Sequence, residues 1–543
     1  MPLYLGFDSS TQSLTAVGLE VLGDRRRIVF ESSLLFDEAL PHYGTRHGVL
    51  PNTDPAVAHS SPLMWAEALE LMVARLAHSD LELDHLAAIS GSAQQHGSVY
   101  LNARAAQAMA TTAAGHSPLE WLPASLSRSE APIWMDSSTA AECAELTEAV
   151  GGSHVLARHT GSRAFERFTA AQIRKFFKQD PTAYAATDRI HLVSSFLASL
   201  LVNHHASLDP GDGSGTNLMD LRTSEWWPIA VDATAPDLLA RLPAVTPASS
   251  VVGTVSRYWQ SRYGLPPAKV IAWTGDNPSS LVGIGLVREG LMAISLGTSD
   301  TIFGLMHTPR VDPSGTGHVF GSPTGAYMGL TVFSNGSLAR ERVRNENGLT
   351  WDQFSHVLDR TPAGNGGRIL LPWFRPEITP TVLVPGVRRY GLEATDREAH
   401  VRGVVEAQMM SLALHSRWMG VEVRTIFATG GATANLALLR IMADVFGADV
   451  YQSERRNTAC LGAALRAFQG DARARGEPWS WEDIVRDVTG SSAAGAIHPD
   501  PQRHELYQSL MSIYAECEAH ALGRGPDPEP SLRRIRQELL PNP

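Results

Sequence analysis

Lysine is scarce in this chain. Of 543 residues, 45 are lysine or arginine, yet only Lys175, Lys178 and Lys269 are lysines. None of them follows a GxxxxG run or precedes Ser or Thr, which excludes a Walker-A phosphate loop. Lys175 and Lys178 share one polar segment, so there are also few candidates for Schiff-base chemistry. Any phosphate bound by this chain must therefore be held by backbone N–H groups, hydroxyls, a metal ion or arginine.

Cysteines, long apolar runs and excess positive charge are also missing. Cys143, Cys460 and Cys517 are too few and too scattered for a disulfide framework or a zinc site, and we expect them to be structural thiols. The net charge of −11 argues against a nucleic-acid partner. No apolar run reaches the ~18 residues of a membrane span. Because Asp8 stands where a signal peptide would need an apolar core, we expect a cytoplasmic protein with no membrane partner.

The hydrophobic pattern predicts an α/β protein with an internal duplication. Residues 4–21 and 290–306 each place two apolar, strand-like runs around a turn rich in hydroxyl groups. Two such hairpins, roughly 290 residues apart, indicate two halves with the same core topology. Strand-like runs at 85–101, 269–277 and 424–432 end in small or polar residues, and α/β folds bind ligands at such strand ends.

Other segments predict the organisation around these halves. At ~150 residues per unit, the length predicts three to four domain-sized units. A composition shift at 250–268 is a candidate domain junction, and residues 103–131, rich in Ala and Ser, are expected to be a surface excursion. After about residue 475 the chain is polar with a Pro-rich stretch at 525–530, so we expect the last ~20 residues to be loosely ordered.

Two turns have the chemistry of a phosphate site. In residues 6–11, Asp8 ends the first strand and hydroxyl residues follow, so the carboxylate could hold a hydrated Mg²⁺ while turn N–H groups face a phosphate. A plain hairpin turn is the alternative for either copy alone. The second copy, residues 295–300, favours a pair of turns that clamp one polyphosphate.

Two further strand ends carry candidate functional groups. Gly430 and Gly431 lie between a strand and a helix, where the backbone can approach a nucleoside or a phosphate, although a generic Gly-Gly turn remains the alternative. Asp276 follows an apolar strand and precedes Asn277 and Pro278. It is either a helix cap or a general base that accepts a proton from an attacking hydroxyl.

A series of motifs follows along the chain in this order: GFDSSTQS, SGSAQQHGSVY, PIWMDSSTAAEC, GSRAFERFTAAQI, DGSGTNL, TGDNPSSLVG, SLGTSDTIF, FSNGSLARERVR and ATGGATANLALLRIMADVFGADVY. Together they closely resemble the xylulokinase branch of the FGGY carbohydrate kinase family in the actin-like ATPase superfamily. The resemblance implies two duplicated ribonuclease-H-like α/β domains that flank a deep cleft. We place a mainly sugar-binding domain at 1–260, a mainly ATP-binding domain at 261–475 and a polar extension at 476–543.

The same resemblance implies roles for individual residues. It implies Asp276 as the catalytic base and a sugar site of Gln95, His96, Arg167, Asp276 and Asn277. It implies ATP and Mg²⁺ contacts from Asp8, Thr11, Gly297, Thr298, Trp351, Gly430, Gly431 and Asn435, with Asp8 as the metal ligand. Alternatives exist for three of them: His96 as a satisfied interior histidine, Arg167 as a surface partner of Glu166, and Trp351 as a hydrophobic anchor of its helix.

The chain departs from the family pattern at two places. Ser10 stands where many members have Gly in the first phosphate turn. How closely this turn approaches the phosphate is therefore left open. After Trp134, the segment Asp136-Ser137-Ser138 lacks the arginine of the usual Asp-x-Arg. Any substrate contact from such an arginine is therefore absent, and Arg167 is the expected cation.

The activity that the resemblance implies is ATP-dependent phosphorylation of D-xylulose to D-xylulose 5-phosphate. The partners are then a small sugar and ATP, with no nucleic acid and no membrane, and the oligomeric state stays open. A kinase for another ketose or polyol, such as ribulose or glycerol, is the nearest alternative. An actin-like nucleotide-switch protein is the alternative from another class.

Overall fold

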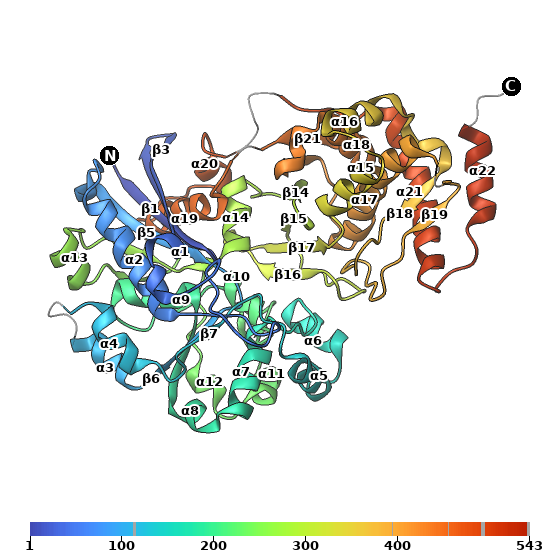
Figure 1. Cartoon of the computed structure of the whole chain (residues 1–543). Coiled ribbons are helices and arrows are strands. Elements are labelled where there is room, and N and C mark those ends of the chain that lie inside the picture. The colour runs from blue at the N-terminus through green and yellow to red at the C-terminus, as the bar shows by residue number, and fades with distance from the viewer. Residues whose placement is uncertain (112–115, 394, 454, 490–494, 540–543) are drawn as a thin grey trace.

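The computed structural model describes residues 1–111, 116–393, 395–453, 455–489 and 495–539. Two lobes lie side by side, each built around one large sheet (Figure 1). Within the described residues, no helix is long and apolar enough to cross a membrane.

The first lobe contains a seven-stranded sheet with the order β11-β12-β5-β1-β2-β3, and β13 pairs with the end of β5. The strands are β1 (Leu3–Ser9), β2 (Ser13–Leu22), β3 (Arg25–Leu35), β5 (Leu86–Ala93), β11 (Val251–Thr254), β12 (Lys269–Ile271) and β13 (Thr274–Gly275). β1, β2 and β3 form an antiparallel meander, while β5 runs parallel to β1.

The second lobe repeats this pattern in a six-stranded sheet with the order β16-β17-β15-β14-β20-β21. Its strands are β14 (Leu291–Leu296), β15 (Asp300–Met306), β16 (His318–Gly321), β17 (Tyr327–Phe333), β20 (Thr425–Thr429) and β21 (Asp449–Gln452). β14, β15 and β17 form the meander and β20 runs parallel to β14. The predicted α/β class and the repeated hairpin are therefore confirmed.

Helices cover both sheets. Those between β3 and β14 are α1 (Phe36–Ala39), α2 (Pro62–Ala77), α3 (Arg104–Thr111), α4 (Pro118–Ser125), α5 (Ala140–Ala149), α6 (Ser153–Thr160), α7 (Thr169–Gln179), α8 (Pro181–Ala186), α9 (Val193–Val202), α10 (Pro210–Gly213), α11 (Pro228–Thr234), α12 (Leu238–Arg241), α13 (Arg257–Tyr263) and α14 (Asp276–Ile284). Those after β17 are α15 (Ser337–Glu346), α16 (Trp351–Arg360), α17 (Arg397–Ser416), α18 (Leu436–Phe446), α19 (Thr458–Ala474), α20 (Trp481–Val485), α21 (Pro501–Ala521) and α22 (Glu529–Leu539). Short strand pairs, β4 (His59–Ser60) with β7 (Ala131–Pro132), β6 (Ser98–Asn102) with β8 (Thr187–Leu192), β9 (Met219–Asp220) with β10 (Glu225–Trp226) and β18 (Ile369–Leu371) with β19 (Arg388–Tyr390), complete the fold.

Helix α19 returns to the first lobe although it follows the second sheet in sequence. It packs against β1, β5 and α14. Two glycines allow α14 and α19 to cross closely: a Cβ at Gly283 would lie 1.8 Å from the carbonyl oxygen of Thr458, and one at Gly462 would lie 1.9 Å from that of Ser279. The chain therefore passes between the lobes after α14, before α19 and again between α20, which packs on α19, and α21, which packs in the second lobe.

Two segments differ from the expectations drawn from composition. The candidate junction at 250–268 lies inside the first sheet, because β11 pairs with β12 and β12 pairs with β5. β11 lies before position 260, the predicted end of the first domain, and β12 and β13 lie after it. All three strands belong to the first sheet. The expected surface excursion at 103–131 forms α3 and α4, with Met109 and Leu122 in the core of the first lobe, while residues 112–115 lie outside the described part.

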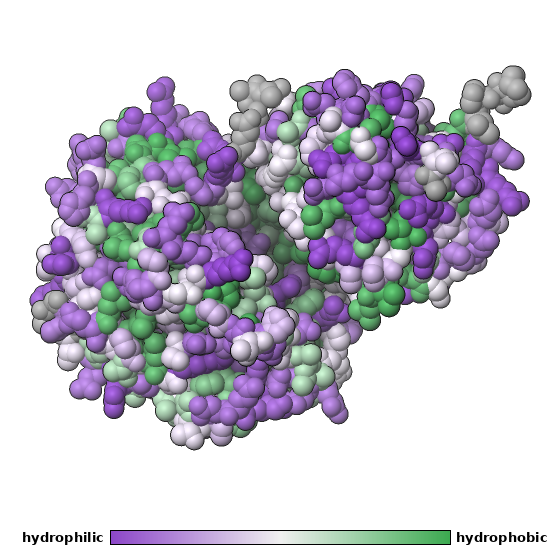
Figure 2. Space-filling model, in the orientation of Figure 1, coloured by the Kyte–Doolittle hydropathy of each residue, from purple (hydrophilic) through white to green (hydrophobic). Residues whose placement is uncertain are grey.

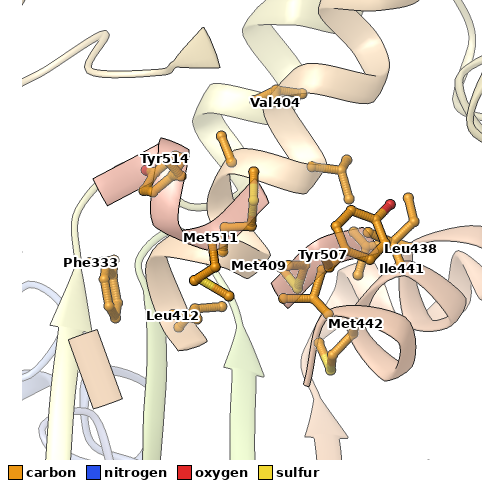
Figure 3. Close-up of a cluster of buried hydrophobic side chains, with 14 of the residues drawn as sticks. Phe333, Val404, Met409, Leu412, Leu438, Ile441, Met442, Tyr507, Met511 and Tyr514 are labelled. Atoms are coloured by element: carbon orange, nitrogen blue, oxygen red, sulfur yellow. The ribbon is translucent and has the colours of Figure 1, made fainter. Parts of the chain in front are cut away.

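The C-terminal segment is also more ordered than expected. Tyr507, Met511 and Tyr514 of α21 pack with side chains of α17, among them Met409, and with Leu438 of α18 in the core of the second lobe (Figure 3). Leu532 and Ile535 of α22 join the same core. The prediction of a loosely ordered end is therefore wrong up to Leu539, and residues 540–543 lie outside the described part.

Candidate functional site

The molecule is hollowed between the two lobes (Figure 2), and the β14–β15 hairpin contributes walls to two cavities. One, of about 360 Å³, takes its walls from both lobes. The other, of about 460 Å³, lies in the second lobe beside the β14–β15 turn. We call them the sugar cavity and the nucleotide cavity, after the ligands that the sequence predicts for their residues.

The structure brings all five predicted sugar-site residues together. Gln95, His96, Arg167, Asp276 and Asn277 line the sugar cavity. Gln95 and His96 follow the carboxyl end of β5, Arg167 precedes α7, and Asp276 begins α14 directly after β13. These strand ends meet at one edge of the first sheet, as parallel strands predict.

Asp276 has the environment of a base. Its Oδ1 accepts hydrogen bonds from the backbone N–H of Asn277 (2.8 Å) and from the Asn277 side-chain amide (2.9 Å). The same amide donates to Oε1 of Gln95 (2.9 Å), so the Asp276 carboxylate is held in a fixed orientation. Burial raises the pKa of Asp276 to about 6, within the range that suits a general base near neutral pH.

His96 is a neutral histidine whose tautomer is set by its surroundings. Its Nδ1 lies 2.6 Å from the carbonyl oxygen of Gly215, which can only accept, so Nδ1 carries the proton and Nε2 is an acceptor. The ring stacks on Phe168 at 4.2 Å, and the residue has a left-handed backbone with φ of 72°. Burial and the charge of Arg167 lower the pKa of His96 to about 3.

Arg167 lies among aromatic rings. Its guanidinium carbon lies 5.1 Å from the centre of the Phe165 ring, and Nη2 lies 3.2 Å from Nε2 of His318. Burial lowers the pKa of Arg167 from its ordinary value, and the guanidinium remains the cation of the cavity.

Sequence reasoning missed the part of the sugar cavity that comes from the second lobe. Thr301, His318, Phe320, Leu330 and Val332 of β15, β16 and β17 line it, together with Trp134 of the first lobe. The repeat of the hairpin was the available signal, because it predicts that the second sheet faces the cleft as the first one does.

The β1–β2 turn places Asp8 close enough to Asp276 for their charges to interact. Asp8 Oδ1 accepts from the Ser92 hydroxyl (2.6 Å). Burial, and to a smaller extent the charge of Asp276, raise the pKa of Asp8 to about 7, although the Ser92 hydrogen bond lowers it. Thr11 Oγ1 accepts from the indole N–H of Trp134 (2.8 Å), which ties this turn to the rim of the sugar cavity.

The nucleotide cavity gathers five of the eight residues expected to contact ATP and Mg²⁺. Gly297, Thr298, Trp351, Gly431 and Asn435 line it.

The other three residues of that set, Asp8, Thr11 and Gly430, are not among its walls. Gly430 makes the turn itself, since its φ is +94° and a Cβ there would lie 2.5 Å from the carbonyl oxygen of Leu296.

Trp351 and Asn435 also have local structural contacts. Asn435 caps α18 by accepting from the backbone N–H of Leu438 (3.1 Å). Trp351 begins α16, packs edge-on against Phe354 at 5.5 Å and keeps 45% of its surface exposed. The guanidinium of Arg344 lies 4.4 Å from the centre of the Trp351 ring. An exposed aromatic face at a cavity wall can stack on a nucleobase.

A buried ion pair supports the second phosphate turn. Asp300 accepts from both terminal nitrogens of Arg340, at 2.7 and 3.0 Å, and Gln408 accepts a third hydrogen bond from Arg340 at 2.8 Å. Both carboxylate oxygens of Asp300 are thus engaged by protein. Asp8, whose carboxylate has a hydroxyl partner, is the better candidate to meet a cation.

Within the described residues, no group of three or more His, Cys, Asp or Glu side chains could hold a metal ion. Proteins bind hydrated Mg²⁺ through one or two carboxylates together with substrate phosphates, so a single carboxylate can contribute to such a site. Asp8 provides such a carboxylate beside a hydroxyl-rich turn.

Comparisons with known proteins show the family. Residues 50–283 match the N-terminal domain, and residues 292–470 the C-terminal domain, of the FGGY family of carbohydrate kinases. The chain is 40% identical over 536 residues to a xylulose kinase from Rattus norvegicus, covering 96% of this chain and 98% of the rat protein. It is 40% identical over 491 residues to xylulose kinase 2 from Arabidopsis thaliana, covering 86% and 87% of the two chains. In fold it is similar to the crystal structure of xylulose kinase from Rhodospirillum rubrum, with a TM-score of 0.79, 20% identity and coverage of 96% and 99%.

Proposed function

The chain belongs to the FGGY family of carbohydrate kinases, an ATP-using family, and we propose that it transfers the γ-phosphoryl group of ATP to D-xylulose to give D-xylulose 5-phosphate. One observation carries the proposal: a polar cavity, with a carboxylate of raised pKa held by Asn277, shares the β14–β15 hairpin with the nucleotide cavity. The rat and Arabidopsis relatives, both named as xylulose kinases, support xylulose as the acceptor.

The residues of the sugar cavity divide into a base and binding groups. Asp276 accepts the proton of the C5 hydroxyl as that oxygen attacks the γ-phosphorus. Arg167 donates to sugar oxygens, and Nε2 of His96 accepts from a sugar hydroxyl, because its Nδ1 proton is committed to Gly215.

The phosphates lie against the two turns. The β1–β2 turn with Asp8 and Thr11 and the β14–β15 turn with Gly297 and Thr298 direct backbone N–H groups and hydroxyls at the transferred group. Asp8, together with the ATP phosphates, would hold Mg²⁺, which would neutralise part of the phosphoryl charge. Closure of the lobes excludes water from the reacting atoms.

A substrate panel tests the proposal. ATP consumption is followed by coupled ADP detection with D-xylulose, D-ribulose, L-ribulose and glycerol as acceptors. We expect the highest kcat/KM with D-xylulose. A higher kcat/KM with ribulose or glycerol would replace xylulose by that acceptor, and ATP turnover that no sugar stimulates would favour a nucleotide switch.

A further inference from the structure

His318 lies where the second lobe touches the sugar site. It is the first residue of β16, the edge strand of the second sheet, and only 2% of its surface is exposed. Two backbone groups of the same strand bond to the first lobe: Val319 N–H donates to the carbonyl oxygen of Gly161 (3.0 Å) and Gly321 N–H donates to the Ser214 hydroxyl (2.9 Å). The edge of the second sheet is therefore docked on the first lobe.

The hydrogen bonds of His318 determine its tautomer. A guanidinium has no acceptor, so Arg167 Nη2 donates and Nε2 of His318 offers its lone pair at 3.2 Å. The proton then lies on Nδ1, which donates to the Ser162 hydroxyl at 3.0 Å. Burial and the charge of Arg167 keep the pKa of His318 well below its ordinary value, so the ring stays neutral and keeps this lone pair.

Aromatic packing holds the ring in this orientation. His318 stacks on Phe320 (5.8 Å between ring centres, 14° between planes) and packs against Phe165 at 4.8 Å and Phe168 at 5.8 Å. Phe165 and Phe168 also face the Arg167 guanidinium, at 5.1 and 6.0 Å. The histidine and the arginine therefore share one aromatic wall of the sugar cavity.

Arg167 depends on this contact for its direction. Among the described residues, its guanidinium makes one hydrogen bond, to His318, and the rings around it supply attraction without fixing the rotation of the fork. A bond from one Nη2 proton fixes the plane of the group and leaves the remaining N–H donors for sugar oxygens. The acceptor that does this comes from the other lobe.

We propose that His318 is a positioning residue for the sugar site: it holds the Arg167 guanidinium through Nε2, so that sugar binding by Arg167 depends on the contact between the two lobes. The inference rests on the proposed function, since it takes Arg167 to bind the sugar. It extends that function by making the second lobe a determinant of sugar affinity as well as of nucleotide binding.

A pair of amide variants tests the role of Nε2. The amide of His318→Asn reaches about as far as Nδ1 and can meet Ser162 but not Arg167, whereas the amide oxygen of His318→Gln reaches about as far as Nε2 and can accept from Arg167. We expect His318→Asn to raise the KM for xylulose roughly 10- to 100-fold, the worth of a hydrogen bond to a charged group, and to change the KM for ATP little. His318→Gln should restore most of the affinity.

A double-mutant cycle shows whether the effect passes through Arg167. In an Arg167→Ala background, His318→Asn should raise the xylulose KM no further. Independent, multiplying effects of the two substitutions would overturn the proposal, as would equal KM values for the Asn and Gln variants. If His318→Asn does not fold by circular dichroism, Ser162→Ala takes its place, with a smaller rise in xylulose KM that must also vanish without Arg167.

Ser214→Ala is the matched control. It removes another contact between β16 and the first lobe but leaves Arg167 and His318 untouched. We expect a xylulose KM close to that of the wild type, and a rise as large as that of His318→Asn would assign the effect to general loosening of the lobes. Wild-type enzyme that does not turn over xylulose would refute the proposed function instead, which separates the two failures.

Discussion

Replacement of Asp276 by Asn should cost activity and gain stability. The substitution removes the charge and the proton acceptor but keeps an oxygen that can accept the two Asn277 hydrogen bonds. Loss of a general base reduces kcat by about 10²–10⁴-fold. The pKa of Asp276 is raised from 3.8 to about 6, and these two units correspond to roughly 3 kcal/mol by which the folded state disfavours the charged form.

The sign of the pH dependence follows from the raised pKa. Between about pH 4 and pH 6 the folded protein binds a proton that the unfolded chain has released, so stability falls as pH rises through this window. Above pH 6 the Asp276 carboxylate is charged in the folded protein, and its burial then lowers the free energy of unfolding by the full amount. Asp276→Asn should therefore be more stable than the wild type at pH 7.5, by up to roughly 3 kcal/mol, and should lose this advantage towards pH 4.

Urea unfolding at pH 7.5 and 4.5 measures the stability, and coupled ADP detection measures kcat. Asp232→Asn, at an exposed position on α11, is the matched control for the loss of one negative charge. In the wild type, kcat/KM should rise with pH through about 6 and then level off, because the base acts unprotonated. A variant with near-normal kcat, or one less stable than the wild type at pH 7.5, would refute the reasoning.

Three further predictions concern the nucleotide and metal contacts. Trp351→Ala should raise the KM for ATP about 10-fold through lost stacking and leave the KM for xylulose unchanged, as steady-state kinetics with each substrate varied would reveal. Gly430→Ala should destabilise the protein, since a Cβ would meet the Leu296 carbonyl oxygen at 2.5 Å. A Cβ at Gly431 would have no neighbouring atom within 4 Å. Gly431→Ala should therefore unfold at the same urea concentration as the wild type and only weaken ATP binding. Asp8→Asn should raise the Mg²⁺ concentration needed for half-maximal activity about 10-fold or more, measured by Mg²⁺ titration at saturating ATP; an unchanged requirement would remove Asp8 as the metal ligand.

Local turn chemistry made the first-lobe half of the site predictable. Asp8 lies near the end of β1, and His96 and Asp276 follow strand-like runs that are visible in the sequence, so their convergence at one sheet edge follows from parallel pairing. His318 and Phe320 lie on an edge strand, and their place in the sugar cavity depends on docking between lobes, which no local pattern encodes.

The errors about order and boundaries have a physical cause as well. Composition marked residues 250–268 as a junction, but strand pairing decides sheet membership, and β11 and β12 pair back to β5. The C-terminal segment looked polar on average. However, Tyr507, Tyr514 and Cys517 of α21 recur at spacings of seven and three residues, so they lie on one helix face that packs into the second lobe.

The charges of the sugar cavity favour an uncharged substrate. His96 and His318 both face Arg167, and burial together with that cation keeps both rings neutral. Above pH 6 the described residues that line the cavity then include one cation, Arg167, and one anion, Asp276. The proposed functions of these two residues are sugar binding and proton acceptance. The positive charge of Arg167 is already balanced by Asp276, so the carboxylate of a sugar acid would be buried without a free cation. A ketose brings only hydroxyls and a carbonyl, which the same donors and acceptors can bind. Because lysine is nearly absent from the chain, arginine is the cation here, and its planar fork can be oriented by a single acceptor such as Nε2 of His318.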